Sequence, residues 1–302
     1  MSFNLAAAPS QQGKIAIVTG ANIGLGYETV IGLAKKGAKV IMACRNIQKA
    51  ETARKEILEK VPGAGLEILQ LDLGDLSSVR AFAKAYTDKY DSLDLLINNA
   101  GIMIPPFSKT KDGFESQMGV NYFGHFLLTS LLFPLLNKTP ESRVVTLSSI
   151  AHRNGKIQFD NLHAEQKYSK MGAYGQSKLA CLMFAYELQR RIDASGSKVL
   201  SLAAHPCVSN TNLGQHMSKW LVAIAMPIFS FFIHSPENAA LPTLYAALGT
   251  DVNGGEYFGP TGYNEMKGKP GKVQSKPHAH DKEVAKKLWA VSEELTGEKF
   301  SI

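Results

Sequence analysis

The stretch KIAIVTGANIGLG, residues 14–26, decides the fold of this chain. Residues 14–18 form an apolar run that is typical of a buried parallel strand, and Thr19-Gly20 closes it. A helix is expected from Gly24 to about Lys36, where Gly37 ends it. Gly20 allows a tight turn, and the later glycines let a pyrophosphate approach the backbone N–H groups of the helix N-terminus. The pattern predicts a phosphate-binding turn, although its spacing differs from G-x-G-x-x-G; the alternative is a glycine-rich turn without a ligand.

Strands and helices alternate along the rest of the chain. Further strands are predicted at residues 39–43, 66–71, 93–97, 143–147 and 198–204, and further helices at residues 47–60, 76–90, 114–136 and 174–191. Such alternation predicts an α/β fold: a parallel sheet with helices on both faces and ligands at the carboxyl ends of the strands. No repeat, linker or break in composition divides the chain, so we expect a single domain over residues 1–302.

Composition narrows the class of protein. The chain has 302 residues, 45% of them hydrophobic, which is enough for one large core. Cys44, Cys181 and Cys207 are irregularly spaced, which argues against a disulfide framework and favours a reducing compartment, the cytoplasm. The formal charge of +7 suits a phosphorylated cofactor or an anionic surface, but solvated lysines are the commoner cause, and we expect no nucleic-acid partner. We expect no secretory signal in residues 1–12 and no metal site at His278 and His280.

An arginine follows the second predicted strand, in the segment 43–46. Folds that bind NAD usually carry an acid at this place, which binds the ribose 2′-hydroxyl. Here Cys44 and Arg45 stand instead, and a guanidinium is suited to a 2′-phosphate. We therefore predict NADP(H) as the cofactor, with NAD(H) as the less favoured alternative. In the other interpretation, Arg45 only caps the edge of the sheet.

Polar and small residues also follow the third and fourth strands. Asp72 can accept a hydrogen bond from the adenine amino group, with Leu73 beside it, or it can simply stabilise a turn. The segment 98–101 reads Asn-Asn-Ala-Gly, and its small residues leave room for a cofactor. An ordinary asparagine-rich turn is the alternative there.

A phenol and an ammonium group stand one helical turn apart at Tyr174 and Lys178. Residues at i and i+4 share one face of a helix. A free phenol has a pKa near ~10 and is a poor base at neutral pH. An ammonium at ~4 Å stabilises the phenolate by about 4 kcal/mol at an effective dielectric of ~20. We therefore predict that Tyr174 acts as an acid–base group with Lys178 as its partner.

Two neighbouring serines and one asparagine complete the set of candidates. Ser148 and Ser149 follow the fifth strand, and alternation along a strand lets only one of them face the cofactor. A hydroxyl there would donate to a carbonyl or alkoxide. Asn121 lies inside the long predicted helix, where its propensity is poor. It is either a functional amide or a satisfied core amide.

These motifs together resemble the short-chain dehydrogenase/reductase superfamily, in order over roughly residues 14–248. They are T-G-x-x-x-G-x-G at 19–26, N-N-A-G at 98–101, Asn121, Ser149 and Y-x-x-x-K at 174–178. The resemblance implies a Rossmann-type doubly wound sheet of about seven strands in the order 3-2-1-4-5-6-7. It implies that Tyr174 is the general acid/base, Lys178 its electrostatic partner and Ser149, not Ser148, the hydroxyl that polarises the carbonyl. Asn121 would anchor a water in a proton relay.

The same resemblance implies a set of cofactor-binding residues. They are Gly20, Asn22, Ile23, Gly24, Leu25, Gly26, Arg45, Asn46, Asp72, Leu73, Asn98, Asn99, Ala100, Gly101, Tyr174, Lys178, Pro206, Val208 and Thr211.

Three further segments are similar to the retinol dehydrogenase branch of the superfamily and to WW-domain oxidoreductases. These are residues 43–46, 120–126 and 148–152, and light-dependent protochlorophyllide reductases share part of them. The branch usually has His-Pro-Gly after the sixth strand, whereas this chain has Cys207 in place of the glycine. The branch often carries an N-terminal membrane anchor, which we do not expect here, so a retinoid substrate is not implied.

The apolar segment WLVAIAMPIFSFFI, residues 220–233, is too short to span a bilayer and contains Pro227. It lies in a variable region at about 210–235, which we expect to form a lid or wall over the substrate. A core or dimer helix and a surface that dips into a membrane are the alternatives. The resemblance also implies a dimer or tetramer assembled through helices 114–136 and 174–191.

The sequence therefore predicts an NADP(H)-dependent oxidoreductase. It would transfer hydride between the nicotinamide and an apolar alcohol or carbonyl: a retinal-like aldehyde, a ketone or a steroid-like substrate. Two alternatives stay open. One is a non-catalytic protein that senses the cofactor, and the other is a reductase of carbon–carbon double bonds that resembles protochlorophyllide reductase.

Overall fold

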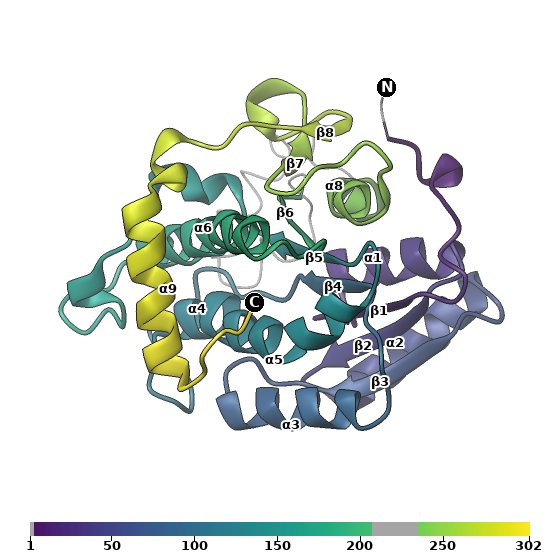
Figure 1. Ribbon diagram of the computed structural model, residues 1–302, viewed down its shortest axis with the longest axis horizontal. Coiled ribbons are helices and arrows are strands. Elements are labelled where there is room, and N and C mark those ends of the chain that lie inside the picture. Colours follow the sequence, from purple (N-terminus) through teal and green to yellow (C-terminus); the bar gives the residue numbers. More distant parts are fainter. Residues whose placement is uncertain (1–2, 207–234) are drawn as a thin grey trace, which may run out of the picture.

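The computed structural model describes residues 3–206 and 235–302 of the chain. One sheet runs through the molecule, with helices layered on both of its faces (Figure 1). The strand order is β3-β2-β1-β4-β5-β6-β7-β8, in which β1 to β7 are parallel and β8 is antiparallel to β7. The strands are β1 (Ile15–Thr19), β2 (Lys39–Cys44), β3 (Leu66–Gln70), β4 (Leu95–Asn98), β5 (Arg143–Leu147), β6 (Leu200–Ala204), β7 (Tyr257–Pro260) and β8 (Pro270–Lys272). The Rossmann-type order that the sequence predicts is confirmed.

The number of strands differs from the expected seven, because the described part of the chain adds β8 at the edge. Pro270–Lys272 is only three residues long and carries no alternating apolar pattern, so nothing in its sequence indicates a strand. The chain reverses between Pro260 and Pro270 and returns beside β7. A short reversal of this kind gives an antiparallel pair, which needs no crossover helix.

Helices cover the sheet in two layers. The helices are α1 (Gly24–Lys35), α2 (Ile47–Lys60), α3 (Leu76–Thr87), α4 (Ser116–Met118), α5 (Gly124–Lys138), α6 (Lys170–Ser195), α8 (Pro236–Leu248) and α9 (Lys282–Thr296). The described short turns are η1 (Leu5–Ala7), η2 (Gly119–Phe123), η3 (Ile150–Asn154), η4 (Phe159–Asn161), η5 (Tyr263–Glu265) and η6 (Pro277–His280). One core lies under α1, α2 and α8, and the other lies under α3, α5 and α6, with α9 packed against α6.

The central strands are apolar on both sides because both of their faces are covered. Along β1, Ala16 and Val18 belong to the core under α1, and Ile17 belongs to the core on the opposite face. All three are completely buried. This explains why residues 14–18 read as a continuous apolar run rather than as an alternating pattern.

The helix predicted over residues 114–136 is interrupted. It consists of α4, a π-helical turn η2 (Gly119–Phe123) and α5. A π turn holds one extra residue and changes the direction of the side chains near it, and such turns are frequent at functional sites. Asn121 lies inside it. The whole stretch Ser116–Lys138 is long and apolar enough to cross a membrane, yet 78% of its most apolar window is buried in the protein, as expected of a core helix.

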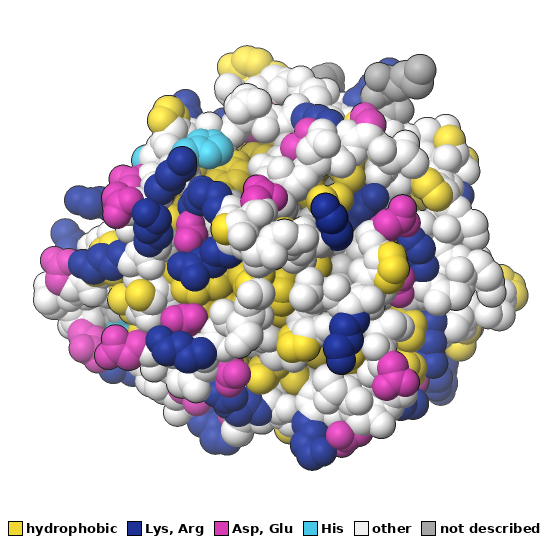
Figure 2. Space-filling view, viewed as in Figure 1, with side chains coloured by type: hydrophobic (Ala, Val, Ile, Leu, Met, Phe, Trp, Pro, Cys, Tyr) yellow, Lys and Arg dark blue, Asp and Glu magenta, His cyan; other side chains and the backbone are white. Residues whose placement is uncertain are grey.

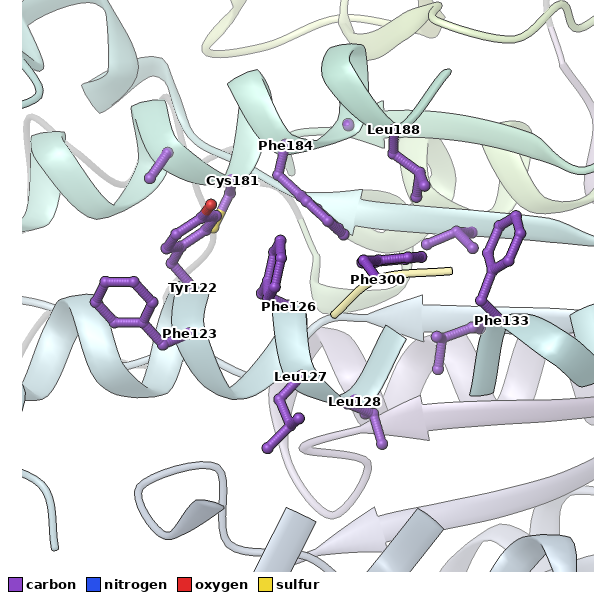
Figure 3. Close-up of a cluster of buried hydrophobic side chains, with 14 of the residues drawn as sticks. Tyr122, Phe123, Phe126, Leu127, Leu128, Phe133, Cys181, Phe184, Leu188 and Phe300 are labelled. Carbon is purple, nitrogen blue, oxygen red and sulfur yellow. The ribbon is translucent and has the colours of Figure 1, made fainter. Parts of the chain in front are cut away.

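An aromatic cluster fills the space between α5, α6 and the C-terminal end of the chain (Figure 3). Phe126 from α5, Phe184 from α6 and Phe300 point toward one another. Trp289 of α9 joins them, with ring centroids 5.2 Å from Phe126 and 5.7 Å from Phe184. The face of the molecule drawn in Figure 2 is polar instead: Lys and Arg are interspersed there with Asp and Glu rather than gathered into one basic patch.

Candidate functional site

Two adjoining clefts lie at the carboxyl ends of the parallel strands. The first has a volume of about 590 Å³ and extends from Arg45 past the glycine-rich turn to Gly101. The second has a volume of about 710 Å³ and is lined by Ser149, Tyr174 and Lys178. The two clefts share four lining residues, Leu25, Asn99, Gly101 and Ile102. Together they form one continuous groove.

The glycine-rich turn has the backbone geometry that its sequence predicts. Gly20 and Gly24 have φ angles of +65° and +59°, a region that side chains other than glycine rarely enter. Gly26 has a different role: a Cβ there would lie 2.2 Å from the Gly20 carbonyl oxygen and 2.6 Å from Asn99 Nδ2. Gly26 therefore lets α1 pack directly onto the turn. Ile23 precedes α1 without a side-chain cap, so the helix N-terminus suits an anion.

Most of the predicted cofactor residues line the first cleft. They are Gly20, Asn22, Ile23, Gly24, Leu25, Gly26, Arg45, Asp72, Leu73, Asn99, Ala100 and Gly101. Asp72 also stabilises its own turn, because its Oδ1 accepts a hydrogen bond from Gly74 N at 2.9 Å. Tyr174, Lys178 and Pro206 line the second cleft instead. Val208, Thr211, Cys207 and nearly all of the expected lid at 210–235 lie outside the described residues.

Among the predicted cofactor residues that the structure describes, two line neither cleft. Asn46 caps α2, where its Oδ1 accepts a hydrogen bond from Lys49 N at 2.8 Å. Asn98 ends β4, is 1% exposed and donates from Nδ2 to Thr129 Oγ1 at 2.9 Å. Alternation along the strand explains Asn98: its side chain points into the helical layer, while the next residue, Asn99, lies at the groove. The geometry thus favours a structural role for both.

Helix α6 places the Tyr174 and Lys178 side chains on the groove. Tyr174 is half-buried, and the Lys178 Nζ lies 5.9 Å from the centroid of its ring. Lys178 is only 6% exposed, and its Nζ donates to the Leu147 carbonyl at 3.1 Å. This bond fixes the ammonium at the end of β5. The groove therefore holds a phenol and a fixed ammonium group near each other.

The two serines after β5 are bonded differently. Ser148 is 2% exposed, and its hydroxyl donates to the Lys178 carbonyl at 2.7 Å. The Ser149 Oγ accepts a hydrogen bond from Ala151 N at 3.2 Å, which leaves its hydrogen available for another acceptor. Both serines line the second cleft. The bonding favours Ser149 as the donor to a bound carbonyl, which is the choice that the family resemblance implies.

Asn121 stands behind the groove rather than in it. Its Oδ1 accepts from Ile102 N at 2.8 Å, and its Nδ2 donates to the Ile102 carbonyl at 3.0 Å and to Ser177 Oγ at 2.9 Å. Its backbone carbonyl accepts from Cys181 Sγ at 3.1 Å and lies 2.9 Å from His125 Nδ1. Asn121 therefore joins three segments of the site. Its role as a water anchor stays a prediction.

Several groove residues were not identified from the sequence. Residues 108–111, with two lysines, line the first cleft. In the second cleft, Arg153 and Glu265 form an ion pair at 2.7 Å, and Glu265 also lies 3.0 Å from His205 Nε2. No local pattern marks these residues, because loops far apart in the sequence bring them together. Thr19 and His125, in contrast, could have been singled out from the sequence, because each is a polar residue within an apolar element.

The lowered pKa values of two buried histidines determine how the stability of the protein is expected to depend on pH. Burial lowers the pKa of His125 and that of His152 to about 4 from the usual 6.5. The unfolded chain then takes up more protons than the folded one as the pH falls through 6.5 toward 4. We expect the free energy of unfolding to fall by about 2 kcal/mol per histidine between pH 6.5 and 5. Urea unfolding at pH 7, 6 and 5 measures this, and equal stability at the three values would contradict it.

The glycine-rich turn, Ser149 and the Tyr174–Lys178 pair follow one another along a single α/β sheet. This arrangement defines the class of protein: an oxidoreductase of the Rossmann type. A profile of the short chain dehydrogenase family matches residues 14–221, which is more than half of the chain. The chain belongs to the short chain dehydrogenase family.

Similarity to individual proteins places the chain in one branch of that family, the retinol dehydrogenases. It is 42% identical to human retinol dehydrogenase 13 over 292 residues, which cover 94% of this chain and 85% of that protein. A crystal structure of an uncharacterized protein from Mycobacterium paratuberculosis is 42% identical, covers 100% of both chains and has a TM-score of 0.84. A short chain dehydrogenase from Escherichia coli CFT073, complexed with NADPH, is 25% identical, covers 78% of this chain and 91% of its own, and has a TM-score of 0.60. The protein is thus an oxidoreductase similar to retinol dehydrogenases.

Proposed function

We propose that this protein is an NADP(H)-dependent oxidoreductase that interconverts an apolar alcohol and its carbonyl compound. The observation that carries the proposal is the continuous groove. It leads from Arg45 past the glycine-rich turn to Ser149, Tyr174 and Lys178. A dinucleotide needs a phosphate cradle at one end and an acid–base pair at the other, and the groove offers both. The NADPH complex of the related Escherichia coli enzyme supports the choice of cofactor.

The residues present fit such a cofactor. Gly20 and Gly24 open the turn, the N-terminus of α1 suits the pyrophosphate, and Arg45 takes the place where an acid would bind a 2′-hydroxyl. Cys44, the neighbour of Arg45, is buried and belongs to the core. Arg45 is exposed at the cleft, where its charge is available to a phosphate. Lys178 is also placed to hold the nicotinamide ribose.

The chemistry of the chain's own residues follows from their bonding. When bound, the nicotinamide supplies or accepts the hydride. In the direction of reduction, the Ser149 hydroxyl donates a hydrogen bond to the carbonyl oxygen as negative charge develops on it. Tyr174 delivers the proton to that oxygen, and Lys178 stabilises the phenolate that remains. In the direction of oxidation, the same groups act in reverse.

The substrate is proposed to be apolar. Leu25, Ile102, Met103, Ile150 and Met171 line the second cleft, and Met171 is 62% exposed although it is a large apolar side chain. An exposed apolar residue beside an acid–base pair is suited to a hydrophobic ligand. The resemblance to retinol dehydrogenases is consistent with retinal-like aldehydes, and ketones or steroid-like compounds fit the same description.

The test is the oxidation of NADPH and of NADH by the purified protein over a panel of apolar aldehydes and ketones. Turnover with NADPH supports the proposal, and the panel ranks the substrates. Binding of NADPH without turnover of any carbonyl would favour the cofactor-sensing alternative. Turnover of an activated carbon–carbon double bond but not of carbonyls would favour the double-bond reductase.

Arg45 is expected to determine the choice between the two cofactors. Replacing Arg45 with Ala removes charge-assisted hydrogen bonds to a 2′-phosphate, which are worth about 2 kcal/mol. We expect the KM for NADPH to rise roughly 30-fold while that for NADH changes less than ~2-fold. Arg54→Ala is the matched control, since Arg54 is a half-buried arginine of α2 that lines neither cleft and pairs with Glu51. Equal increases in KM for both cofactors would show that Arg45 does not bind the 2′-phosphate.

The compartment is proposed to be the cytoplasm. Cys44 and Cys181, the two cysteines within the described ranges, are buried free thiols. Burial raises the pKa of both, which keeps them as unreactive thiols. Such residues need no oxidising environment.

A further inference from the structure

A buried histidine connects the two ends of the groove. His125 belongs to α5 and is 2% exposed. Its Nε2 lies 2.9 Å from Thr19 Oγ1, at the start of the glycine-rich turn. Its Nδ1 lies 2.9 Å from the carbonyl oxygen of Asn121, in the π turn. The mechanism derived above uses none of these contacts.

The bonding of Thr19 determines which ring nitrogen carries the proton. Backbone N–H groups of Asn99 and Ala100 both donate to Thr19 Oγ1, each at 2.9 Å. A hydroxyl has two acceptor sites and one hydrogen, so Thr19 can accept no third bond. The hydroxyl hydrogen has two acceptors within reach, the Ile97 carbonyl at 3.3 Å and His125 Nε2 at 2.9 Å, and the shorter contact favours Nε2. Nε2 cannot donate to the filled hydroxyl, so the ring hydrogen lies on Nδ1. Nδ1–H then donates to the Asn121 carbonyl.

The ring is neutral under ordinary conditions. Burial lowers the pKa of His125 to about 4, and the positive charge of Lys178 acts in the same direction. The hydrogen bond to the Asn121 carbonyl opposes these two effects but is weaker than the burial. His125 thus keeps one donor and one acceptor, on opposite sides of its ring.

Each side of the ring holds a different part of the site. On the acceptor side, Thr19 binds the turn 98–101 through its hydroxyl, and its carbonyl accepts from Asn99 Nδ2 at 2.7 Å. On the donor side, Asn121 holds the Ile102 backbone and Ser177 of α6. A Cβ on Gly101 would lie 3.2 Å from Asn121 Oδ1 and 3.3 Å from Lys178 Nζ, so the Asn121 amide and the ammonium flank Gly101.

We propose that His125 is a positioning residue. It fixes the glycine-rich turn, which begins at Thr19, relative to the helix that carries Tyr174 and Lys178. Its acceptor nitrogen acts on cofactor binding through Thr19, and its donor nitrogen acts on proton transfer through Asn121. The functional half of this inference rests on the proposed function, because it assigns the two bonds to cofactor binding and to catalysis.

Two substitutions separate the two bonds. Asparagine places an amide N–H where Nδ1 stands, so His125→Asn keeps the donor to Asn121 and loses the acceptor for Thr19. Glutamine places its carbonyl oxygen where Nε2 stands, so His125→Gln keeps the acceptor and loses the donor. His125→Phe removes both hydrogen bonds and keeps a side chain of similar volume. These three variants form a matched set at one buried position.

The first measurement uses the protein without cofactor. Long-range ¹H–¹⁵N spectra of histidine-labelled protein should show His125 protonated on Nδ1 only at pH 7, the signal being assigned by its loss in His125→Asn. Hydrogen exchange should be about 10-fold faster at the Asn99 and Ala100 amides in His125→Asn, with Ile102 unchanged. His125→Gln should show the reverse. A doubly protonated ring, or equal exchange at all three amides in both variants, would overturn the proposal.

The second measurement asks whether the bonds matter for function. We expect the Kd for NADPH, from fluorescence titration, to rise about 10-fold in His125→Asn with kcat within ~3-fold of wild type. In His125→Gln we expect kcat to fall about 10-fold with Kd within ~3-fold. Equal losses in both variants would mean that His125 is merely structural. If the wild type itself neither binds NADPH nor turns over, the proposed function fails, while the exchange data still decide the positioning role.

Discussion

Replacement of Tyr174 by Phe is expected to lower kcat about 10³-fold, within the range of 10²–10⁴ typical of a lost general acid. The change removes one hydroxyl and leaves the ring in place. Within the described part of the chain no hydrogen bond holds that hydroxyl, so the fold should be unaffected. We expect the Kd for NADPH to change less than ~3-fold. Steady-state kinetics together with a fluorescence titration measure both quantities.

The matched control is Tyr186→Phe. Tyr186 lies on the same helix, α6, but its hydroxyl donates to Ser275 Oγ at 2.9 Å, away from the groove. Its loss should cost about 1 kcal/mol of stability and leave kcat near that of wild type. Retention of more than about a tenth of the activity in Tyr174→Phe would assign the proton to another group.

The second large effect is expected at Gly26. In Gly26→Ala the new Cβ would lie 2.2 Å from the Gly20 carbonyl oxygen, a backbone atom that cannot move without distorting the turn. We expect NADPH binding to weaken at least ~100-fold, because the turn and the N-terminus of α1 separate. Overpacking should cost about 1–3 kcal/mol, which lowers Tm by roughly 2–5 °C for a chain of this length.

Gly172→Ala serves as the comparison. Gly172 is also the third residue of a helix, α6, but a Cβ there has its nearest neighbour, Ser169 Cβ, at 3.3 Å. We expect unchanged NADPH binding and a Tm equal to or slightly above that of wild type, since Ala favours helix. If Gly26→Ala bound NADPH as well as Gly172→Ala, the close packing of α1 on the turn would not be needed for the cofactor.

The sequence predicts the sheet and the helix that carries Tyr174 and Lys178 well because their signals are local. The apolar run at 14–18 and the i, i+4 spacing of Tyr174 and Lys178 depend on nothing distant. The β8 strand and the ion pair of Arg153 with Glu265 depend on loops that meet only in the folded chain. No local sequence pattern predicts which distant loops will contact each other.

Two local features differ from the sequence expectation for another physical reason, the packing around them. Asn98 sits in a motif that suggests the cofactor, but the pleat of β4 turns its side chain toward Thr129. The π turn at Gly119–Phe123 arises where α5 packs closely on another segment: a Cβ on Gly124 would lie 2.5 Å from the Leu73 carbonyl. Tertiary packing of this kind overrides helical periodicity.

The position of α9 bears on how this chain meets other copies of itself. Trp289 packs against Phe126 and Phe184, and Ser292 Oγ lies 2.7 Å from the Tyr122 hydroxyl. The helix thus lies across α5 and α6 (Figure 1), the pair through which relatives are expected to dimerise. Where α9 packs, apolar side chains of α5 and α6 are already covered by the same chain. The C-terminal helix thus supplies, from within the chain, an apolar partner for these two helices.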